Sequence, residues 1–438
     1  MAGIGRNSVI TFTAQVLSII LGLASSVMLA RMLGPRDRGI FELILLIHAV
    51  ILRFGTLGLD ASSVYFSGRN EFKLKDIVSN ALSLSIVFGI ILILLFFIIS
   101  RFGVFINFLS SNSINPLYLW LVILTNPIYL LFYFFNHILL GKEEVKKYNI
   151  INIFHTFLFL LFVFIFLYLL NQQIIGGIIS YILSIILVTL LLIFYIRKIS
   201  VIAFGFNKIL FRESMKYGLK SHIGNIAQFL NYRLDMFLIA VFLTPTEVGY
   251  YIISVSLVEK IFMIPNAIAT VLFPRVASLK ECDANNITSK VSRHTFIIVL
   301  FLSFFIALLS NPFIRILFGS IFLPAVMPLI ILLPGVIALS VAKILSSDIA
   351  GRGKPQYNTY ASIVSLVLNF TLNLYFIPLW GIRGAAFSST VSYVATFLIV
   401  TVVFTKISGK SWLDVLRFNK MDFQDYKEFG LRIRAYIK

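Results

Sequence analysis

Eight charged side chains lie inside long apolar stretches of this chain, where they could bind ions or a charged substrate. The basic ones are Arg53, Arg233, Lys260 and Lys343, and the acidic ones are Glu42, Asp60, Asp235 and Glu259. A charge at the centre of a membrane-spanning helix costs about 2.5–3.5 kcal/mol, so such residues face partners or water. The basic set suits an anion as large as a pyrophosphate. The acidic set is predicted to couple ions, and desolvated carboxylates could either exchange protons or hold sodium through oxygen ligands.

The spacing of these charges predicts which of them share a helix face. Glu42, Arg53 and Asp60 are separated by 11 and 7 residues, which brings all three to one side of a helix. For Arg53 and Asp60, a buried ion pair and a cavity-lining role both fit, and Glu42 could equally lie at a solvated helix end. Glu259 and Lys260 are adjacent, so they point about 100° apart and at least one must face protein or water.

A stripe of small and polar residues repeats at an offset of 210. The first copy is Ser8, Thr11, Gln15, Ser18, Gly22 and Ser25, and the second is Gly218, Ser221, Asn225, Gln228, Tyr232 and Asp235. Alternating steps of three and four keep each stripe on one helix face. Such a face packs against another helix or lines a wet cavity. If the two stripes line a wet cavity, Gln15, Asn225 and Gln228 are cavity-lining residues.

The elements that carry these residues must be membrane helices. Of 438 residues, 59% are hydrophobic and 13% are charged, with a mean hydropathy of +0.97. A water-soluble globule of this composition would expose large apolar patches. Windows of about 19 residues predict twelve spans. They lie near 8–33, 39–66, 77–100, 116–140, 150–170, 175–196, 217–243, 248–273, 294–314, 324–350, 358–377 and 383–405.

The distribution of basic residues predicts the orientation. With the N-terminus inside, and with Arg31, Lys220 and Arg383 at span ends counted with the adjoining loops, 27 of the 37 Lys and Arg residues fall in inside segments, 6 in outside loops and 4 within spans. This bias predicts that both termini are cytoplasmic, and it explains the net charge of +19 without nucleic acid. The first apolar run is expected to be a span, with no cleaved leader.

The same sequence argues against enzyme, cofactor and metal classes. The predicted outside loops are short, so they leave no room for a catalytic domain, and no GxxxxGK[ST] motif indicates an ATPase. Cys282 is the single cysteine, and no Cys/His cluster has the spacing of metal ligands. We therefore predict neither an enzyme nor a bound cofactor or metal.

An internal repeat predicts the architecture. Residues 29–39 align with residues 239–249, in the same register as the polar stripes. Six helices per repeat give both halves the same orientation in the membrane. We expect an all-α protein with two parallel six-helix lobes, 1–209 and 210–405, around a central cavity, followed by a basic cytoplasmic tail, 406–438.

Several Gly- and Pro-containing segments resemble those of the polysaccharide (O-antigen or capsule) repeat-unit flippases, which belong to the multidrug/oligosaccharidyl-lipid/polysaccharide exporter superfamily. The resemblance runs from about residue 3 to residue 405. It is carried by the segments 29–39, 315–319, 331–335, 350–355 and 373–386. The family has no short catalytic motif, so it transfers no site residue to this chain.

The resemblance implies a bacterial inner-membrane protein that moves an undecaprenyl-pyrophosphate-linked oligosaccharide from the cytoplasmic to the outer leaflet. Alternating access, with proton or sodium antiport, is the mechanism implied. Partners would be the lipid-linked oligosaccharide, membrane lipids, and the polymerase and chain-length regulator of the same lipopolysaccharide or capsule pathway. Alternative interpretations are a multidrug/cation antiporter of the same superfamily, a murein-precursor flippase, for which two further helices are missing, and a polysaccharide polymerase.

Overall fold

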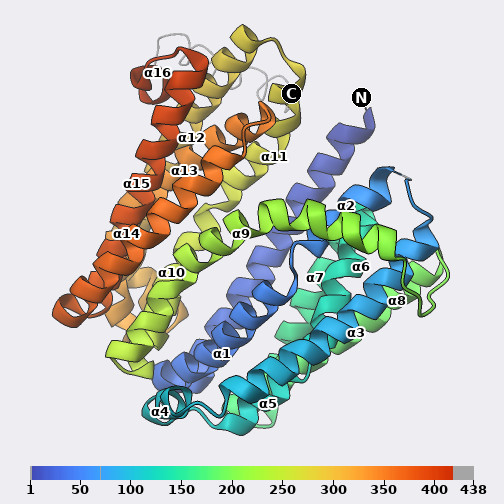
Figure 1. Cartoon of the computed structure of the whole chain (residues 1–438). Helices are drawn as coiled ribbons and strands as arrows, with labels where there is room; N and C mark the ends of the chain where they lie inside the picture. The colour runs from blue at the N-terminus through green and yellow to red at the C-terminus, as the bar shows by residue number, and fades with distance from the viewer. Residues whose placement is uncertain (1, 70, 418–438) are drawn as a thin grey trace, which may run out of the picture. The chain divides into compact units, whose positions relative to one another are not determined.

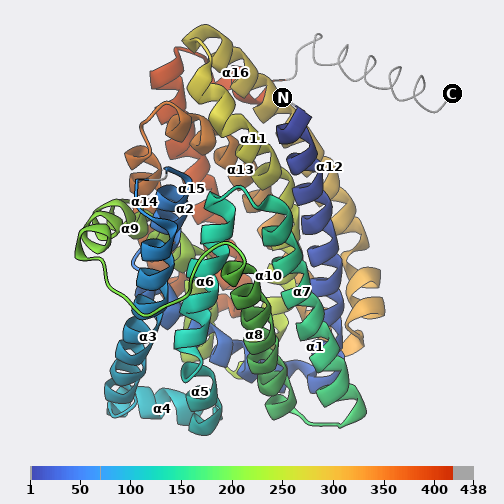
Figure 2. The ribbon, with the colours of Figure 1, turned by 90° about the vertical axis from the view of Figure 1, so that its right-hand side faces the viewer.

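The computed structural model describes the backbone of residues 2–69 and 71–417, and the side chains of 11–69, 71–219 and 222–417. Within these residues every regular element is a helix (Figures 1 and 2). Among the described residues, ten helical stretches are long and apolar enough to cross a membrane. The all-α membrane fold predicted from composition is therefore confirmed, whereas the division into twelve spans stays a prediction.

The chain divides into two compact units that interleave along the sequence. Unit 1 contains Met1–Phe229, Met236–Ile253 and Ile314–Ala325. Unit 2 contains Leu230–Asp235, Ser254–Phe313 and Val326–Lys438. The lobes proposed at 1–209 and 210–405 stay a prediction.

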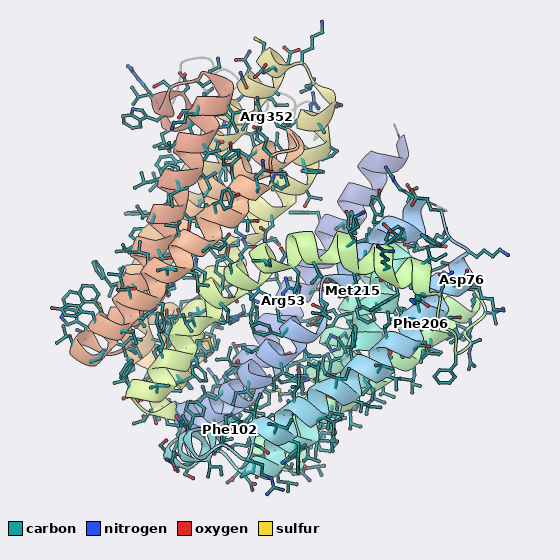
Figure 3. The ribbon with its side chains drawn as sticks, viewed as in Figure 1. Arg53, Asp76, Phe102, Phe206, Met215 and Arg352 are labelled. Carbon is teal, nitrogen blue, oxygen red and sulfur yellow. The ribbon has the colours of Figure 1, made fainter. Side chains whose placement is uncertain are left out.

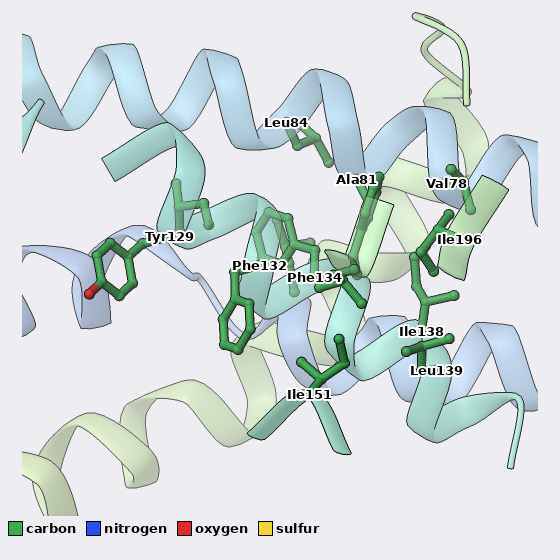
Figure 4. Packing of buried hydrophobic residues seen from close by; sticks show 14 of the residues in the cluster. Val78, Ala81, Leu84, Tyr129, Phe132, Phe134, Ile138, Leu139, Ile151 and Ile196 are labelled. Carbon is green, nitrogen blue, oxygen red and sulfur yellow. The ribbon is translucent and has the colours of Figure 1, made fainter. Parts of the chain in front are cut away.

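The first half of the chain forms helices that belong to unit 1. They are α1 (Ala2–Gly55), α2 (Leu59–Arg69), α3 (Leu74–Ile99), α4 (Gly103–Ser111), α5 (Pro116–Ile123), α6 (Asn126–Gly141), α7 (Val145–Val163), the π-helix η1 (Phe164–Leu169) and α8 (Ile174–Arg197). Helix α6 packs against α2, α3 and α8, and α7 packs against α1 and α8. Fully buried Val78, Phe134 and Ile138 belong to the apolar core shown in Figure 4.

The second half of the chain contributes to both units. Its helices are α9 (Lys208–Phe242), α10 (Pro245–Ile261), α11 (Met263–Ser278), α12 (Glu281–Leu317), the 3₁₀ helix η2 (Ser320–Ala325), α13 (Val326–Gly351), α14 (Gln356–Trp380), α15 (Ile382–Ser408) and α16 (Trp412–Leu416). In unit 2, α15 packs between α13 and α14, and α13 also contacts α11. Fully buried Leu345, Ile349 and Phe404 form part of that core.

Two helix boundaries depend on residues with positive φ. Within α1, two helices meet at a kink where Gly34 has φ 70°, beside Pro35. The predicted span 39–66 is interrupted, since Leu57 and Gly58 have φ values of 48° and 75°. A continuous right-handed helix cannot pass through residues with positive φ, so the chain leaves α1 and begins α2 in a new direction. Glu42 and Asp60 therefore do not share one unbroken helix face.

The two repeated segments contact each other inside unit 1. A Cβ atom on Gly39 would collide with the carbonyl oxygen of Pro245, and one on Gly249 would collide with that of Pro35. These four residues correspond pairwise at the offset of 210. The repeat therefore packs against its own copy, backbone against backbone, through two glycines.

Candidate functional site

The Arg53–Asp60 pair lies where α1 ends and α2 begins, in unit 1 (Figure 3 labels Arg53). The guanidinium Nη1 is 4.0 Å from the Asp60 Oδ2, and the side chains are 32% and 20% exposed. The helix is interrupted at Leu57 and Gly58, so the chain turns between Arg53 and Asp60. These residues form a loose, half-buried ion pair. Their role in lining a cavity stays a prediction.

Two further side chains join this pair. His222 of α9 is buried and interacts electrostatically with Arg53 and Asp60. Tyr133 of α6, 37% exposed, interacts electrostatically with the same two charges. The buried Arg53 Nε and His222 Nε2 have no hydrogen-bond partner among the described residues. Unit 1 thus presents unused polar atoms beside a partly exposed cation, an arrangement that can bind an anion.

Glu42 does not join the Arg53–Asp60 pair but forms an ion pair with Arg38. Its carboxylate is 2.6 Å from Nη2 of Arg38, one turn earlier in α1. The Arg38 side chain is 5% exposed and that of Glu42 is 17% exposed. This ion pair is shorter than those of Asp60 and Glu259 with their arginines. The role of Glu42 in ion coupling stays a prediction.

The basic residues of unit 2 gather around aromatic and acidic side chains. Arg233 of α9 lies 3.0 Å from Glu259 of α10, with side-chain exposures of 28% and 32%. Lys343 of α13 donates to Asn266 Oδ1 at 2.9 Å, and its ammonium lies 4.7 Å from the centroid of the Phe262 ring. Cation–π contact and a single amide oxygen hold this ammonium in place without a direct carboxylate contact.

Lys260 differs from these residues. It is half-buried at the end of α10, and no ion pair or hydrogen bond of its side chain occurs within the described structure. Its neighbour Glu259 faces Arg233. The two adjacent residues therefore follow the prediction that at least one of them faces a protein partner.

Asp235 is the most deeply buried of the four predicted coupling carboxylates. It is 2% exposed and accepts a hydrogen bond from Ser389 at 3.1 Å. One helical turn away, the Asn231 oxygen accepts from Asn369 at 3.1 Å and from Ser392 at 3.0 Å. The part of α9 that belongs to unit 2 thus forms an oxygen-rich polar network with α14 and α15 around Asp235.

One buried oxygen atom of this network has no hydrogen-bond partner among the described residues. Asn373 donates to the Asn369 oxygen. The Oδ1 atom of Asn373 is buried, and no hydrogen-bond partner for it occurs in the part of the chain that the structure describes. Buried carbonyl oxygens are ordinarily hydrogen-bonded. A carboxylate, a serine hydroxyl and an unused amide oxygen are suitable ligands for a small cation or acceptors for a proton.

The predicted cavity-lining residues have different environments. Gln15 and Gln228 are exposed and Asn225 is half-buried. Thr11, on the same stripe, accepts a hydrogen bond from Asn149 of α7 at 3.0 Å. The side chains of Ser8 and Ser221 lie outside the described residues. Part of the first stripe therefore packs against a neighbouring helix, and its role in a cavity stays a prediction.

Sequence reasoning missed several functional candidates. Asn231, Asn369 and Asn373 carry a signal, because asparagines inside apolar runs and spaced by four in α14 indicate a polar helix face. Asp348, near the end of α13, is also fully buried, and it accepts hydrogen bonds from Thr288 at 2.6 Å and from Arg352 at 2.5 Å.

The described residues contain no group of three or more His, Cys, Asp or Glu side chains that could hold a metal ion. The polar groups described above are dispersed in two clusters, one in each unit. Whether both line one central cavity stays a prediction.

Comparison with known proteins identifies similar sequences. A family model described as "Polysaccharide biosynthesis protein" matches residues 4–280. A putative O-antigen transporter of Shigella flexneri is 23% identical over 420 residues, covering 92% of this chain and 98% of that protein. A probable low-salt glycan biosynthesis flippase of Haloferax volcanii is 28% identical over 186 residues, which is 42% of this chain. That match spans only 39% of the length of the Haloferax protein.

Solved structures show the same fold. The lipid II flippase MurJ in an inward closed conformation superimposes with a TM-score of 0.74 at 18% identity, covering 98% of this chain and 97% of that one. An inward-facing multidrug resistance MATE family transporter of the MOP superfamily gives a TM-score of 0.70 at 14% identity, with coverages of 92% and 99%. At these identities the likeness concerns the fold.

Proposed function

Because the chain belongs to the polysaccharide biosynthesis protein family, we propose that it is a flippase for a lipid-linked oligosaccharide. The substrate would be an undecaprenyl-pyrophosphate-linked repeat unit that moves from the cytoplasmic to the outer leaflet of a bacterial inner membrane by alternating access. The name of the Shigella relative, which mentions O-antigen, and that of the Haloferax relative, which mentions a glycan flippase, support this substrate class.

The observation that carries the proposal is the set of partly exposed cations within membrane helices. A multi-sugar headgroup cannot cross about 30 Å of hydrocarbon unaided, since its hydroxyls would lose their water. Arg53 and Arg233 keep 32% and 28% of their side chains accessible, although each is paired with a carboxylate. A pyrophosphate can compete with Glu259 for the Arg233 guanidinium, because both bind in the same bidentate manner.

Coupling to an ion is assigned to the network around Asp235. A buried carboxylate beside serine and asparagine oxygens can take up a proton or a sodium ion and release it when water enters. Asp60 and Glu259, which face arginines, would respond to the substrate's charge. The four proposed substrate-binding residues remain Arg53, Arg233, Lys260 and Lys343.

A complementation experiment tests this function. In a strain that lacks its own repeat-unit flippase, Arg233→Gln and Lys343→Gln should each lower surface polysaccharide about tenfold or more, as expected for a lost charge-assisted hydrogen bond. The double variant Arg233→Gln/Lys260→Gln should be at least as defective. Lipid-linked repeat units should accumulate at the cytoplasmic leaflet, and protein levels are matched by immunoblot.

The control is Arg275→Gln, which removes an exposed cation of α11 that belongs to neither cluster. It should support normal surface polysaccharide. Full polysaccharide from the double variant would overturn the proposed role of the cations. Drug hypersensitivity of the deletion strain together with normal polysaccharide would indicate a multidrug antiporter, and single surface units would indicate a polymerase.

A further inference from the structure

A cavity of about 510 Å³ lies in unit 1 where α3 ends, α4 crosses and α5 begins. Its apolar walls include Phe96, Phe97 and Trp120, and its polar lining includes Ser100, Arg101 and Ser110. All of these residues come from one stretch of 25 consecutive positions, 96–120. The cavity is therefore a local feature of unit 1, separate from the Arg53–Asp60 cluster.

Its position corresponds to a boundary between hydrocarbon and water. Helix α3 is a candidate span with a mean hydropathy of 3.1, and it ends at Ile99, two residues before Arg101. The next candidate span begins at Pro116 with α5. Between them, Phe102 and Val104 at the start of α4 are 60% and 85% exposed (Figure 3 labels Phe102). Apolar residues this exposed indicate that α4 lies in the membrane interface.

The charge of Arg101 has no local counterpart. No Asp or Glu occurs between Asp76 and Glu143, and the structure describes no ion pair of Arg101. The guanidinium lies 4.7 Å from the centroid of the Phe97 ring, which fixes its position while leaving its N–H groups available. A cation held at the membrane boundary, with aromatic walls beneath it, suits a phosphate that carries an apolar chain.

The two serines favour a lipid headgroup that carries hydroxyl groups. The Ser100 hydroxyl donates to Phe97 O at 2.7 Å, and the Ser110 hydroxyl donates to Ile106 O at 3.0 Å. Since each hydroxyl proton is already used, the serine oxygens can only accept further hydrogen bonds. A headgroup that carries its own hydroxyl groups can donate to them, whereas a choline headgroup cannot.

The same combination recurs in unit 2. A cavity of about 530 Å³ is lined by Arg383, Trp380 and Phe387, at the junction of α14 and α15. The chain has only 3 Trp residues, and two of them line these two cavities, each with a single arginine. Tryptophan is enriched at membrane interfaces, where its ring lies at the level of the headgroups. The recurrence is the pattern expected of lipid sites.

We propose that the cavity between α3, α4 and α5 binds an anionic glycerophospholipid with a hydroxyl-bearing headgroup, such as phosphatidylglycerol. Arg101 binds the phosphate, the Ser100 and Ser110 oxygens accept from the headgroup hydroxyls, and an acyl chain follows the wall of Phe96 and Trp120. On the predicted orientation, this lipid belongs to the outer leaflet. The site goes beyond the proposed translocation of glycans and does not depend on it.

Lipid binding here would stabilise the position of α4. The ring of Phe108 in α4 stacks on Phe237 of α9, with centroids 5.0 Å apart. Arg36 of α1 donates to the Ser113 hydroxyl just after α4, at 3.0 Å. Both contacts lie within unit 1. A lipid bound beside α4 would therefore stabilise a helix that follows α3 in the chain and is held against α1 and α9.

The test uses purified full-length protein in nanodiscs of phosphatidylcholine with increasing phosphatidylglycerol. Thermal unfolding and native mass spectrometry report binding. Phosphatidylglycerol should raise the Tm of the wild-type protein. Arg101→Gln should weaken binding about tenfold or more, as expected for a lost charge-assisted contact. Ser110→Phe should abolish binding by filling the cavity, and Arg101→Lys should retain part of it.

The matched control is Arg315→Gln, which removes an exposed arginine in the last turn of α12 that does not line this cavity. It should bind phosphatidylglycerol like the wild type. The proposal is overturned if Arg101→Gln and Ser110→Phe both bind normally, if phosphatidylcholine binds equally well, or if inorganic phosphate alone gives the same stabilisation. No glycan is present, so this result is independent of the translocation experiment.

Discussion

Asp348 and Arg352 show how a charge is accommodated at residue scale inside unit 2. Asp348 is fully buried, and its two oxygens accept hydrogen bonds from Thr288 and Arg352. Arg352, labelled in Figure 3, also donates to Asn285 at 2.6 Å. The residues close a hydrogen-bonded network between α12 and α13, with each charge satisfied by its neighbours.

Removing one member of this network should destabilise the protein. Arg352→Met leaves the Asp348 carboxylate buried without its counter-ion, which costs about 3–5 kcal/mol. Thermal unfolding in detergent should show a clear fall in Tm. The double variant Arg352→Met/Asp348→Leu should recover much of the loss, because no buried charge remains. An unchanged Tm in the single variant would contradict the network's structural role.

The buried carboxylate of Asp235 gives the second prediction at this scale. Asp235→Asn keeps the shape and the hydrogen bond from Ser389 but removes the negative charge that a proton or sodium ion would neutralise. Surface polysaccharide should fall about tenfold or more, consistent with the loss of a charge-assisted interaction. Transport in vesicles should no longer respond to an ion gradient.

The control for this prediction is Glu71→Gln, which neutralises a carboxylate that is 46% exposed. It should leave both readouts unchanged. An Asp235→Asn protein with a normal response to proton and sodium gradients would place the coupling group elsewhere.

At the scale of elements, the glycines of the repeated segments decide how closely two turns can approach. A Cβ atom at Gly39 or Gly249 has no room, because the carbonyl oxygen of the opposite proline occupies that place. Both neighbours are backbone atoms, which cannot rotate away as a side chain can. Close packing of the repeat therefore requires glycine at both positions.

Gly39→Ala and Gly249→Ala should each destabilise the protein. Overpacking of this kind costs about 1–3 kcal/mol, and here we expect the upper part of that range. Tm and yield in detergent are the measurements. Gly103→Ala is the matched control, because nothing lies within 4 Å of a Cβ built at this helical position. It should be neutral or more stable by up to about 1 kcal/mol.

At the scale of the whole molecule, the topology can be tested with the protein's own single cysteine. Cys282 is exposed in the first turn of α12. The count of Lys and Arg predicts that this turn is cytoplasmic. A membrane-impermeant maleimide should therefore leave Cys282 unlabelled in intact cells and label it after permeabilisation.

A second variant completes the topology test. In a Cys282→Ser background, Ser111→Cys places a thiol at the exposed end of α4, which the same count assigns to the outer side. It should be labelled in intact cells. Labelling of Cys282 from outside, or of Ser111→Cys only after permeabilisation, would reverse the predicted orientation.

Much of the fold could be derived from sequence because hydropathy and helix breaking are local properties. The apolar runs predicted the membrane helices, and the gap between the predicted spans 8–33 and 39–66 contains the kink at Gly34 in α1. The Gly- and Pro-containing segments indicated the family that the comparisons confirm. The interruption at Leu57 was not predicted, since nothing about an apolar leucine signals a positive φ.

The intramembrane charges could likewise be found in the sequence alone, because any charge in an apolar run requires a partner. Their partners were decided by tertiary structure. Glu42 pairs with Arg38, and Asp235 accepts from Ser389, a residue 154 positions away. Which residues meet depends on how each helix is rotated and which neighbour it packs against. Hydropathy does not encode that rotation, since a membrane helix is apolar on nearly every face.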